Sequence, residues 1–132
     1  MPVSHSIRRR YSFEAAHFLP LVPDGHKCKR MHGHNYEFEV VVSGQLDKRG
    51  WVLDFWDLDA IVNPIVERLD HRLLNEIEGL ENPTAEVIAA WLMTRIDKAV
   101  RALAGSKAAL RGVAGVYVYE TKDAIAECLN LA

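Results

Sequence analysis

The stretch from 34 to 46, HNYEFEVVVSGQL, constrains the fold more than any other part of this chain. Its residues fall into two alternating sets: Tyr36, Phe38, Val40 and Val42 in one, and Glu37, Glu39, Val41 and Ser43 in the other. Successive side chains of a β-strand point to opposite faces, so the first set forms a continuous apolar face. The pattern therefore predicts a half-buried strand over 34–46.

A second strand is predicted from Ile7 to His17, where the apolar and polar residues alternate in part. Two prolines, a glycine and several charges indicate a loop over 18–31. After the 34–46 strand, DKRG at 47–50 predicts a turn, and residues 51–55 are predicted to return as an extended piece.

Two helices are predicted in the middle of the chain. Asp54 or Asp57 offers an N-cap for the first helix, which runs towards Leu69 and which Pro64 should break or kink. For the second helix, the predicted cap is Asn82, and Pro83 occupies the first helical position. Its apolar residues recur at spacings of three and four, as expected of a helix that packs one face on a sheet: Val87, Ile88, Trp91, Leu92, Ile96, Ala99, Val100 and Leu103.

The last part of the chain is predicted to return to strands. Residues 105–112 are interpreted as a loop, 113–121 as a β-rich run, and a short final strand is expected near 125–131. The resulting order is β-β-α-α-β-β, which favours an α+β fold with a four-stranded antiparallel sheet and both helices on one face. Length and the absence of repeats predict one domain, 1–132, whose uncovered sheet edges are candidates for subunit contacts.

Charge and cysteine content exclude several classes of function. The formal net charge is −2, which gives no footprint for binding nucleic acid or acidic membranes. The run Arg8-Arg9-Arg10 is interpreted first as a solvated or subunit-contacting segment and only second as an anion contact, because strand side chains alternate between faces. Two distant cysteines form no disulfide framework, and the N-terminus has no uninterrupted apolar segment, so a reduced, cytoplasmic setting is expected.

The segment CKRMHGH at 28–34 carries the strongest chemical signal. His32 and His34 are two residues apart, so in a strand both imidazoles point to the same face and can converge on one ion. His17, at the end of the other predicted strand, can supply a third nitrogen. Three histidines with an open fourth position are the ligand set that a catalytic zinc ion uses.

The role of Cys28, four residues before His32, remains open on spacing alone. It either completes a closed structural site of one cysteine and three histidines, or stands beside the metal as a base whose thiolate the cation favours.

Three acidic or basic groups elsewhere admit two interpretations each. Asp70 and His71, adjacent at a predicted helix end, form either an ordinary surface pair or a proton relay. Glu120 follows the parity of Val116 and Val118, so it is either a surface residue at a strand end or an anchor that accepts hydrogen bonds from a ligand ring.

Five segments together resemble a known family: FEAAH, CKRMHGHNY, LDHRLLN, LENPTAEV and YET, in this order and at these intervals. They are similar to the 6-pyruvoyltetrahydropterin synthase family, and in particular to its bacterial branch, the 6-carboxy-5,6,7,8-tetrahydropterin synthases. The resemblance covers nearly the whole chain. The three-residue gap between Cys28 and His32 is similar to that of the bacterial carboxy enzymes, since the gap in the animal pyruvoyl enzymes is wider.

The resemblance implies a tunnelling fold, in which ββααββ subunits join their sheets into a trimeric barrel and two trimers stack as a hexamer. It implies that His17, His32 and His34 bind Zn²⁺ and that Cys28 is the general base. It further implies a proton relay of Asp70 and His71, a pterin anchor at Glu120, and added pterin contacts from Thr84 and Thr121. In such hexamers the pocket lies at a subunit interface.

The implied activity is that of a zinc-dependent carbon-carbon lyase of queuosine, or 7-deazaguanine, biosynthesis. It would convert 7,8-dihydroneopterin triphosphate to 6-carboxy-5,6,7,8-tetrahydropterin, acetaldehyde and triphosphate. One alternative is a 6-pyruvoyltetrahydropterin synthase, which stops before the carbon-carbon cleavage; a more remote one is a non-catalytic zinc- or pterin-binding module. Lys27, Lys29 and Arg30 flank the cysteine and are either contacts for the triphosphate or a solvated charged loop.

Overall fold

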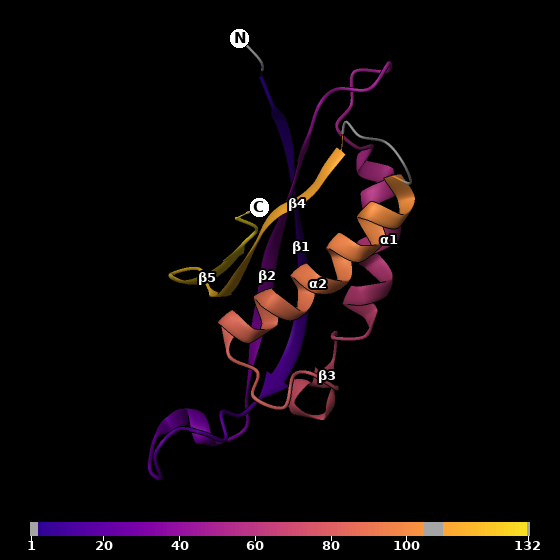
Figure 1. The fold of residues 1–132 in the computed structure, drawn as a ribbon. Coiled ribbons are helices and arrows are strands. Elements are labelled where there is room, and N and C mark those ends of the chain that lie inside the picture. The colour runs from indigo at the N-terminus through magenta and orange to yellow at the C-terminus, as the bar shows by residue number, and fades with distance from the viewer. Residues whose placement is uncertain (1–2, 105–109, 132) are drawn as a thin grey trace.

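The computed structural model describes residues 3–104 and 110–131 and has an α+β fold. The elements are, in chain order, β1 (His5–His17), β2 (His32–Gly44), α1 (Phe55–Glu67), β3 (Arg72–Leu73), α2 (Ala85–Ala104), β4 (Leu110–Thr121) and β5 (Ala124–Leu129), with short 3₁₀ turns at Lys27–Lys29 and Leu74–Glu76. The described strands form one sheet in the order β3-β1-β2-β4-β5 (Figure 1). The predicted fold class is confirmed.

The sheet differs from the prediction in one strand. β3 adds a fifth strand that pairs in parallel with Ala15 and Ala16 of β1, whereas the other pairs of neighbouring strands are antiparallel as predicted. β3 has two residues, which is too short for an alternating pattern to reveal it. It nevertheless brings the segment after α1 to the edge of the sheet beside the end of β1.

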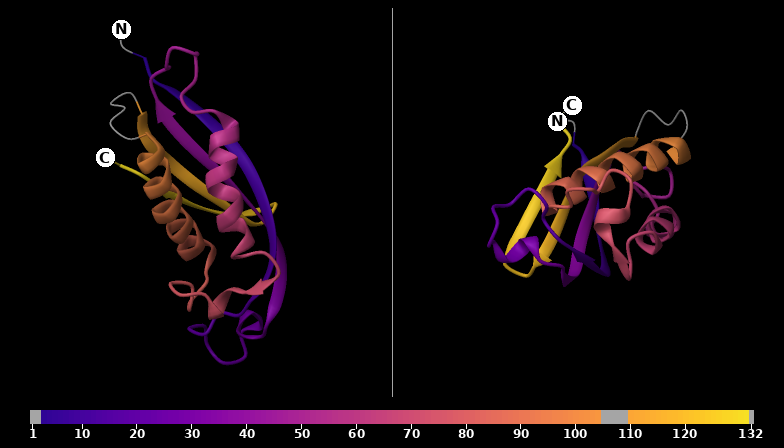
Figure 2. Two further views of the ribbon diagram at one scale, coloured as in Figure 1. Left: turned by 90° about the vertical axis from the view of Figure 1, so that its right-hand side faces the viewer. Right: turned by 90° about the horizontal axis from the view of Figure 1, so that it is seen from below.

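β1 and β2 are long paired strands, and their register runs without a shift from His5 opposite Gly44 to His17 opposite His32. Both helices lie on the same face of the curved sheet, as Figure 2 shows in its left view. The loop between β1 and β2 projects beyond the lower end of the sheet in Figure 1. Histidines at the paired ends of β1 and β2 are therefore placed next to that loop.

The apolar core lies between the sheet and the helices. Tyr36, Phe38, Val40 and Val42, the apolar set of the 34–46 pattern, are all fully buried. They meet Leu58 and Val62 of α1 and Ile88, Leu92 and Ile96 of α2 in one cluster. Each buried aliphatic or aromatic side chain of this kind contributes about 1.5–3 kcal/mol, so the alternation accounts for the face to which the helices pack.

The three consecutive arginines of β1 form ion pairs within the chain. Arg8 and Arg10 lie on the helix-free face, where both donate to the Glu39 carboxylate at 3.1 and 3.0 Å. Arg9 points to the other face and binds Asp59 of α1 at 2.9 Å. The predicted alternation of these side chains is confirmed, and their positive charge is largely matched by carboxylates.

The predicted extended piece at 51–55 is wrong. The turn before it is closed by hydrogen bonds between Asp47 and Trp51, and α1 begins at Phe55. Because β2 is already paired with β1 on one side and β4 on the other, a strand returning from this turn would find no free edge of β2. Residues 51–54 instead lead directly into the helix, with Asp54 as its N-cap.

The helix ends also differ in part from the prediction. α1 continues through Pro64 to Glu67 rather than breaking there. The cap of α2 is Thr84 and not Asn82, because the Thr84 hydroxyl accepts from the amide of Val87 at 3.1 Å and α2 starts at Ala85. Of the predicted loop 105–112, residues 105–109 lie outside the described part, while 110–112 belong to β4. Neither described helix is long and apolar enough to cross a membrane.

Candidate metal centre and active site

Three histidines converge where β1 and β2 end. His17 is the last residue of β1 and pairs with His32, the first residue of β2, while His34 pairs with Ala15. His32 and His34 share a face, as the spacing predicted, and one ligand nitrogen from each of the three residues lies within 4.8 Å of the others. The prediction that these residues come together is confirmed.

Hydrogen bonds to the main chain determine which nitrogen of two histidines is available. Nδ1 of His17 donates to the carbonyl oxygen of Pro83 at 2.9 Å, and Nδ1 of His32 donates to that of Arg30 at 2.7 Å. Each neutral ring then keeps its lone pair on Nε2, and these two Nε2 atoms face each other at 3.0 Å. Two facing lone pairs at this distance require a proton or a metal ion between them.

The third histidine has an unmatched nitrogen. Nε2 of His34 is buried and has no hydrogen-bond partner among the described residues. Burial lowers the pKa values of both His34 and His17, although donation to Pro83 opposes this for His17. The charge of Glu120 opposes the shift in both rings, but burial is the larger effect and favours the neutral form, which is the form that binds metal.

This donor set fits a divalent transition metal. Three imidazole nitrogens suit zinc better than a hard cation such as magnesium, which prefers oxygen ligands. Second hydrogen bonds from ligand histidines to carbonyl groups are the usual means of orienting such rings. Cys28 is not part of the group of mutually close donor atoms that the three histidines form.

Cys28 lies in the loop that joins His17 at the end of β1 to His32 at the start of β2, on the 3₁₀ turn Lys27–Lys29. Nδ1 of His26 caps the turn by accepting from the Cys28 amide at 3.0 Å, and the Cys28 carbonyl accepts from the Leu19 amide at 2.8 Å. The turn has no buried residue, so these hydrogen bonds are what orders it. The sequence analysis missed His26; its position two residues before Cys28 was the available signal.

Glu120 reaches the same centre from the end of β4. Its Oε1 lies 3.6 Å from the unpartnered Nε2 of His34, at the distance of an ion pair rather than of a good hydrogen bond. The carboxylate is partly exposed, so it can accept from a ligand that enters beside the histidines. Thr84 caps α2, and Thr121 accepts from the Asp123 amide at 3.3 Å, so both hydroxyls already have a structural partner.

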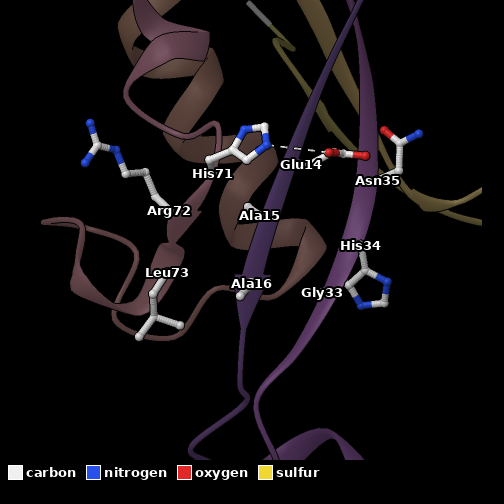
Figure 3. Close-up of a pocket in the computed structure, with 9 residues that line it drawn as sticks. All are labelled: Glu14, Ala15, Ala16, Gly33, His34, Asn35, His71, Arg72 and Leu73. Atoms are coloured by element: carbon white, nitrogen blue, oxygen red, sulfur yellow. Dashed lines mark ion pairs between the residues drawn. The ribbon is translucent and has the colours of Figure 1, made fainter.

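Asp70 and His71 lie on the other side of β1, in the turn that precedes β3. Oδ2 of Asp70 accepts from Nδ1 of His71 at 2.8 Å, and its Oδ1 accepts from the Glu14 amide at 2.9 Å. A cavity of about 540 Å³ between β1, β2 and β3 is lined by His71 and by His34 (Figure 3). His71 and His34 thus border one hollow from opposite sides of β1.

Comparison with known proteins agrees with this arrangement. Residues 6–130 match the family described as 6-pyruvoyl tetrahydropterin synthase. The chain belongs to this family. It is 43% identical over 99 residues to the 6-carboxy-5,6,7,8-tetrahydropterin synthase of Synechocystis, covering 70% of this chain and 75% of that one. It is also 44% identical over 89 residues to the dihydroneopterin monophosphate aldolase of Pyrococcus furiosus, covering 67% and 72%.

A solved structure supports the same family assignment. The 6-pyruvoyl tetrahydropterin synthase of Caenorhabditis elegans superposes with a TM-score of 0.80 at 26% identity, covering 98% of this chain and 97% of that one. The resemblance inferred from five short segments is therefore confirmed, and so is the fold that it implied for the subunit.

The family segments also contain residues that hold His17, and the chain directly after it, by hydrogen bonds. Asn75, in LDHRLLN, holds the chain directly after His17 through paired bonds with the Phe18 amide and carbonyl at 3.0 and 2.8 Å. Pro83, in LENPT, supplies the carbonyl that orients His17, and the Tyr36 hydroxyl lies 3.1 Å from the same ring. Sequence reasoning did not predict these contacts: Asn75 and Pro83 lie outside any periodic pattern, and the alternation in β2 places Tyr36 in the core without revealing the partner of its hydroxyl.

Proposed function

We propose that this member of the 6-pyruvoyl tetrahydropterin synthase family is a zinc-dependent 6-carboxy-5,6,7,8-tetrahydropterin synthase. The observation that carries the proposal is the convergence of three histidine nitrogens, with the Glu120 carboxylate 3.6 Å from one of them. The Synechocystis relative of that name adds support from sequence. The substrate would be 7,8-dihydroneopterin triphosphate and the products 6-carboxytetrahydropterin, acetaldehyde and triphosphate, in the cytoplasm and as part of queuosine biosynthesis.

His17, His32 and His34 would hold the zinc ion through their Nε2 atoms. When bound, zinc supplies a Lewis acid that lowers the cost of removing protons from carbons next to the substrate's hydroxyl groups. Glu120, an acceptor-only group at neutral pH, would bind the N–H groups of the pterin ring and so fix the side chain over the histidines. Thr84 and Thr121 remain proposed as weaker pterin contacts.

Proton transfers would be carried by Cys28 on one side and by Asp70 and His71 on the other. The Cys28 thiolate would remove the C1′ proton, and its capped turn would keep the sulfur in place. Among the basic residues of this loop, Lys29 is paired with Asp24, whereas Lys27 and Arg30 have no ion pair with any described residue. We therefore assign the triphosphate contacts to Lys27 and Arg30 before Lys29.

The complete pocket would form at an interface between subunits. β5 and the part of β1 beyond β3 leave both edges of the sheet available for pairing, and closing such sheets into a barrel removes the edges. A trimeric barrel, stacked in pairs as a hexamer, would also allow Asp70 and His71 of one subunit to approach Cys28 of the next.

Two other enzymatic activities and one non-catalytic role are the alternatives. A 6-pyruvoyltetrahydropterin synthase would stop before carbon-carbon cleavage, and the similarity to the Caenorhabditis elegans protein favours it as the first alternative. The aldolase of Pyrococcus furiosus is named for a dihydroneopterin monophosphate, so a substrate with a shorter phosphate chain is the second. A non-catalytic zinc- or pterin-binding module would bind but release no phosphate.

One experiment separates these functions. The zinc-loaded protein is incubated with 7,8-dihydroneopterin triphosphate, and separately with the monophosphate, and the products are identified by mass spectrometry. We expect 6-carboxytetrahydropterin and acetaldehyde from the triphosphate. The pyruvoyl product would identify the first alternative, turnover confined to the monophosphate the second, and binding without phosphate release a non-catalytic module.

A further inference from the structure

Glu14 holds the turn of Asp70 and His71 through its main chain. Its amide donates to Oδ1 of Asp70 at 2.9 Å, and its carbonyl accepts from the amide of His71 at 2.6 Å. Both groups belong to the edge of β1 beyond its pairing with β3, where a strand normally has unpaired polar groups. The turn of Asp70 and His71 is thus attached to β1 as if it were a short extension of β3.

His71 is fixed in an uncommon backbone conformation. Its φ is +58°, in the left-handed region that few residues other than glycine adopt. Such a conformation persists where surrounding contacts determine it, and here the contacts are the two hydrogen bonds of Glu14 and the bond from Nδ1 to Asp70. The bond to Asp70 orients the ring, although most of the side chain is exposed to solvent.

The second nitrogen of His71 faces the Glu14 side chain. Nε2 lies 3.8 Å from Oε2 of Glu14, along the dashed line in Figure 3. His71 therefore has a carboxylate at each ring nitrogen, Asp70 on Nδ1 and Glu14 on Nε2. Figure 3 also shows the side chain of Arg72, the nearest basic residue of the cavity lining, pointing away from this pair.

The two carboxylates favour the protonated form of His71. The hydrogen bond and charge of Asp70 raise the pKa of His71, and the charge of Glu14 raises it further. Asp70 has a lowered pKa because it accepts from the Glu14 amide and from His71. These side chains are well exposed, so solvent weakens the Glu14 contribution without reversing its sign.

We propose that Glu14 is a positioning residue that, together with Asp70, holds His71 as a charged imidazolium so that His71 donates a proton to the substrate. This inference rests on the proposed function. When Cys28 removes the C1′ proton, the electron pair of that C–H bond stays on the substrate. The Nε2–H bond of His71 breaks, and its proton forms a bond to the substrate atom that receives this pair. The imidazole is left neutral and still hydrogen-bonded to Asp70, and Glu14 does not contact the substrate itself.

The coupling between Glu14 and His71 is tested without turnover by NMR titration of the histidine rings, with the His71 signal assigned from a His71→Gln variant. Glu14→Gln retains the main-chain bonds and the side-chain shape and removes only the charge. We expect it to lower the measured pKa of His71 by about 0.2 to 0.7, the range for an exposed ion pair. Asp70→Asn should lower it more, and Glu37→Gln, on the same sheet face of β2 but paired with Arg10, should leave it unchanged.

The proton-donor role is tested by the pH dependence of kcat. Because a donor must be protonated, activity falls as pH rises through its pKa, and Glu14→Gln should move this alkaline limb to lower pH by the same amount as the NMR value. Zinc content and kcat at low pH should stay near those of the unmodified enzyme. A purely structural role would lower kcat at every pH instead.

The two measurements test the two parts of the proposal independently. An unchanged pKa of His71 in Glu14→Gln overturns the coupling, and a lowered pKa with an unmoved alkaline limb overturns the donor role. If the unmodified enzyme does not act on dihydroneopterin triphosphate at all, the proposed function and the donor role fall together, while the titration still decides whether Glu14 acts on His71.

Discussion

Removal of one histidine ligand should abolish stabilisation by zinc. We choose His32→Ala, because His32 is partly exposed, whereas truncating the fully buried His17 would also leave a cavity in the core. In the unmodified protein, the ion would be held by His17 and His32, whose Nε2 atoms lie 3.0 Å apart, and by His34, whose Nε2 has no hydrogen-bond partner among the described residues. With two ligands remaining, we expect binding too weak to stabilise the fold at micromolar zinc.

The size of the effect follows from linkage. Free zinc at 100 times its dissociation constant adds about 2.7 kcal/mol to the free energy of unfolding of a protein that binds it only when folded. For 132 residues, the unfolding entropy is about 0.28 kcal/mol/K at roughly 2.1 cal/mol/K per residue. Zinc should therefore raise the Tm of the unmodified protein by about 10 °C, and that of His32→Ala by less than about 2 °C.

Differential scanning calorimetry at one fixed protein concentration measures this difference. Chelator-treated protein is scanned alone, with zinc and with magnesium, which should produce no shift because imidazole nitrogens are poor ligands for it. His5→Ala, which removes an exposed histidine at the opposite end of β1, is the matched control and should keep the full zinc shift. A full shift in His32→Ala, or an equal shift with magnesium, would refute the three-histidine site.

The other predictions concern the residues around the metal and the assembly. Cys28→Ala should keep zinc and Tm near the unmodified values while kcat falls by about 10²-fold or more, as for loss of a general base; stoichiometric loss of zinc would identify Cys28 as a ligand instead. Glu120→Gln should raise KM more than it changes zinc content, because an amide nitrogen donates where the carboxylate only accepts; unchanged KM and kcat would contradict the anchor. His26→Ala should lower kcat by about 2- to 30-fold through loss of the turn's cap, and His26→Asn, which retains an acceptor, should restore most of it. Equal damage in both variants would mean that the imidazole itself is needed. Light scattering should give a hexamer, and a mass near the 14.9 kDa of one chain at micromolar concentration would contradict it.

The sequence predicted those parts of the fold that depend on repetition. The alternation of Tyr36, Phe38, Val40 and Val42 determined the buried face of β2, because period two allows these side chains only one side of the sheet. The same parity rule placed His32 and His34 together. The pairing of β1 with β2 then brought in His17, since a register without a shift leaves the two strand ends side by side.

The parts that could not be predicted depend on single contacts between distant segments. β3 has two residues, and only their pairing with Ala15 and Ala16 makes them a strand. No pattern in the sequence reveals that pairing. Thr84 and Asn82 are both good caps by residue type, and the choice between them is made by where the helix packs. Glu14 appears in the sequence as an outward-facing strand residue, and its link to His71 exists only because the chain after α1 returns to the edge of β1.

The metal site itself is oriented mainly by the main chain, which explains why its supporting residues are hard to identify from side-chain chemistry. The carbonyls of Pro83 and Arg30 fix the rings of His17 and His32, and any residue at these positions would supply a carbonyl. What matters is where the backbone runs, and that depends on Thr84 capping α2 and on Asn75 holding the chain after His17. Substituting Asn75 should therefore disturb zinc binding more than substituting Arg30, although Arg30 is the nearer residue in sequence to two of the ligands.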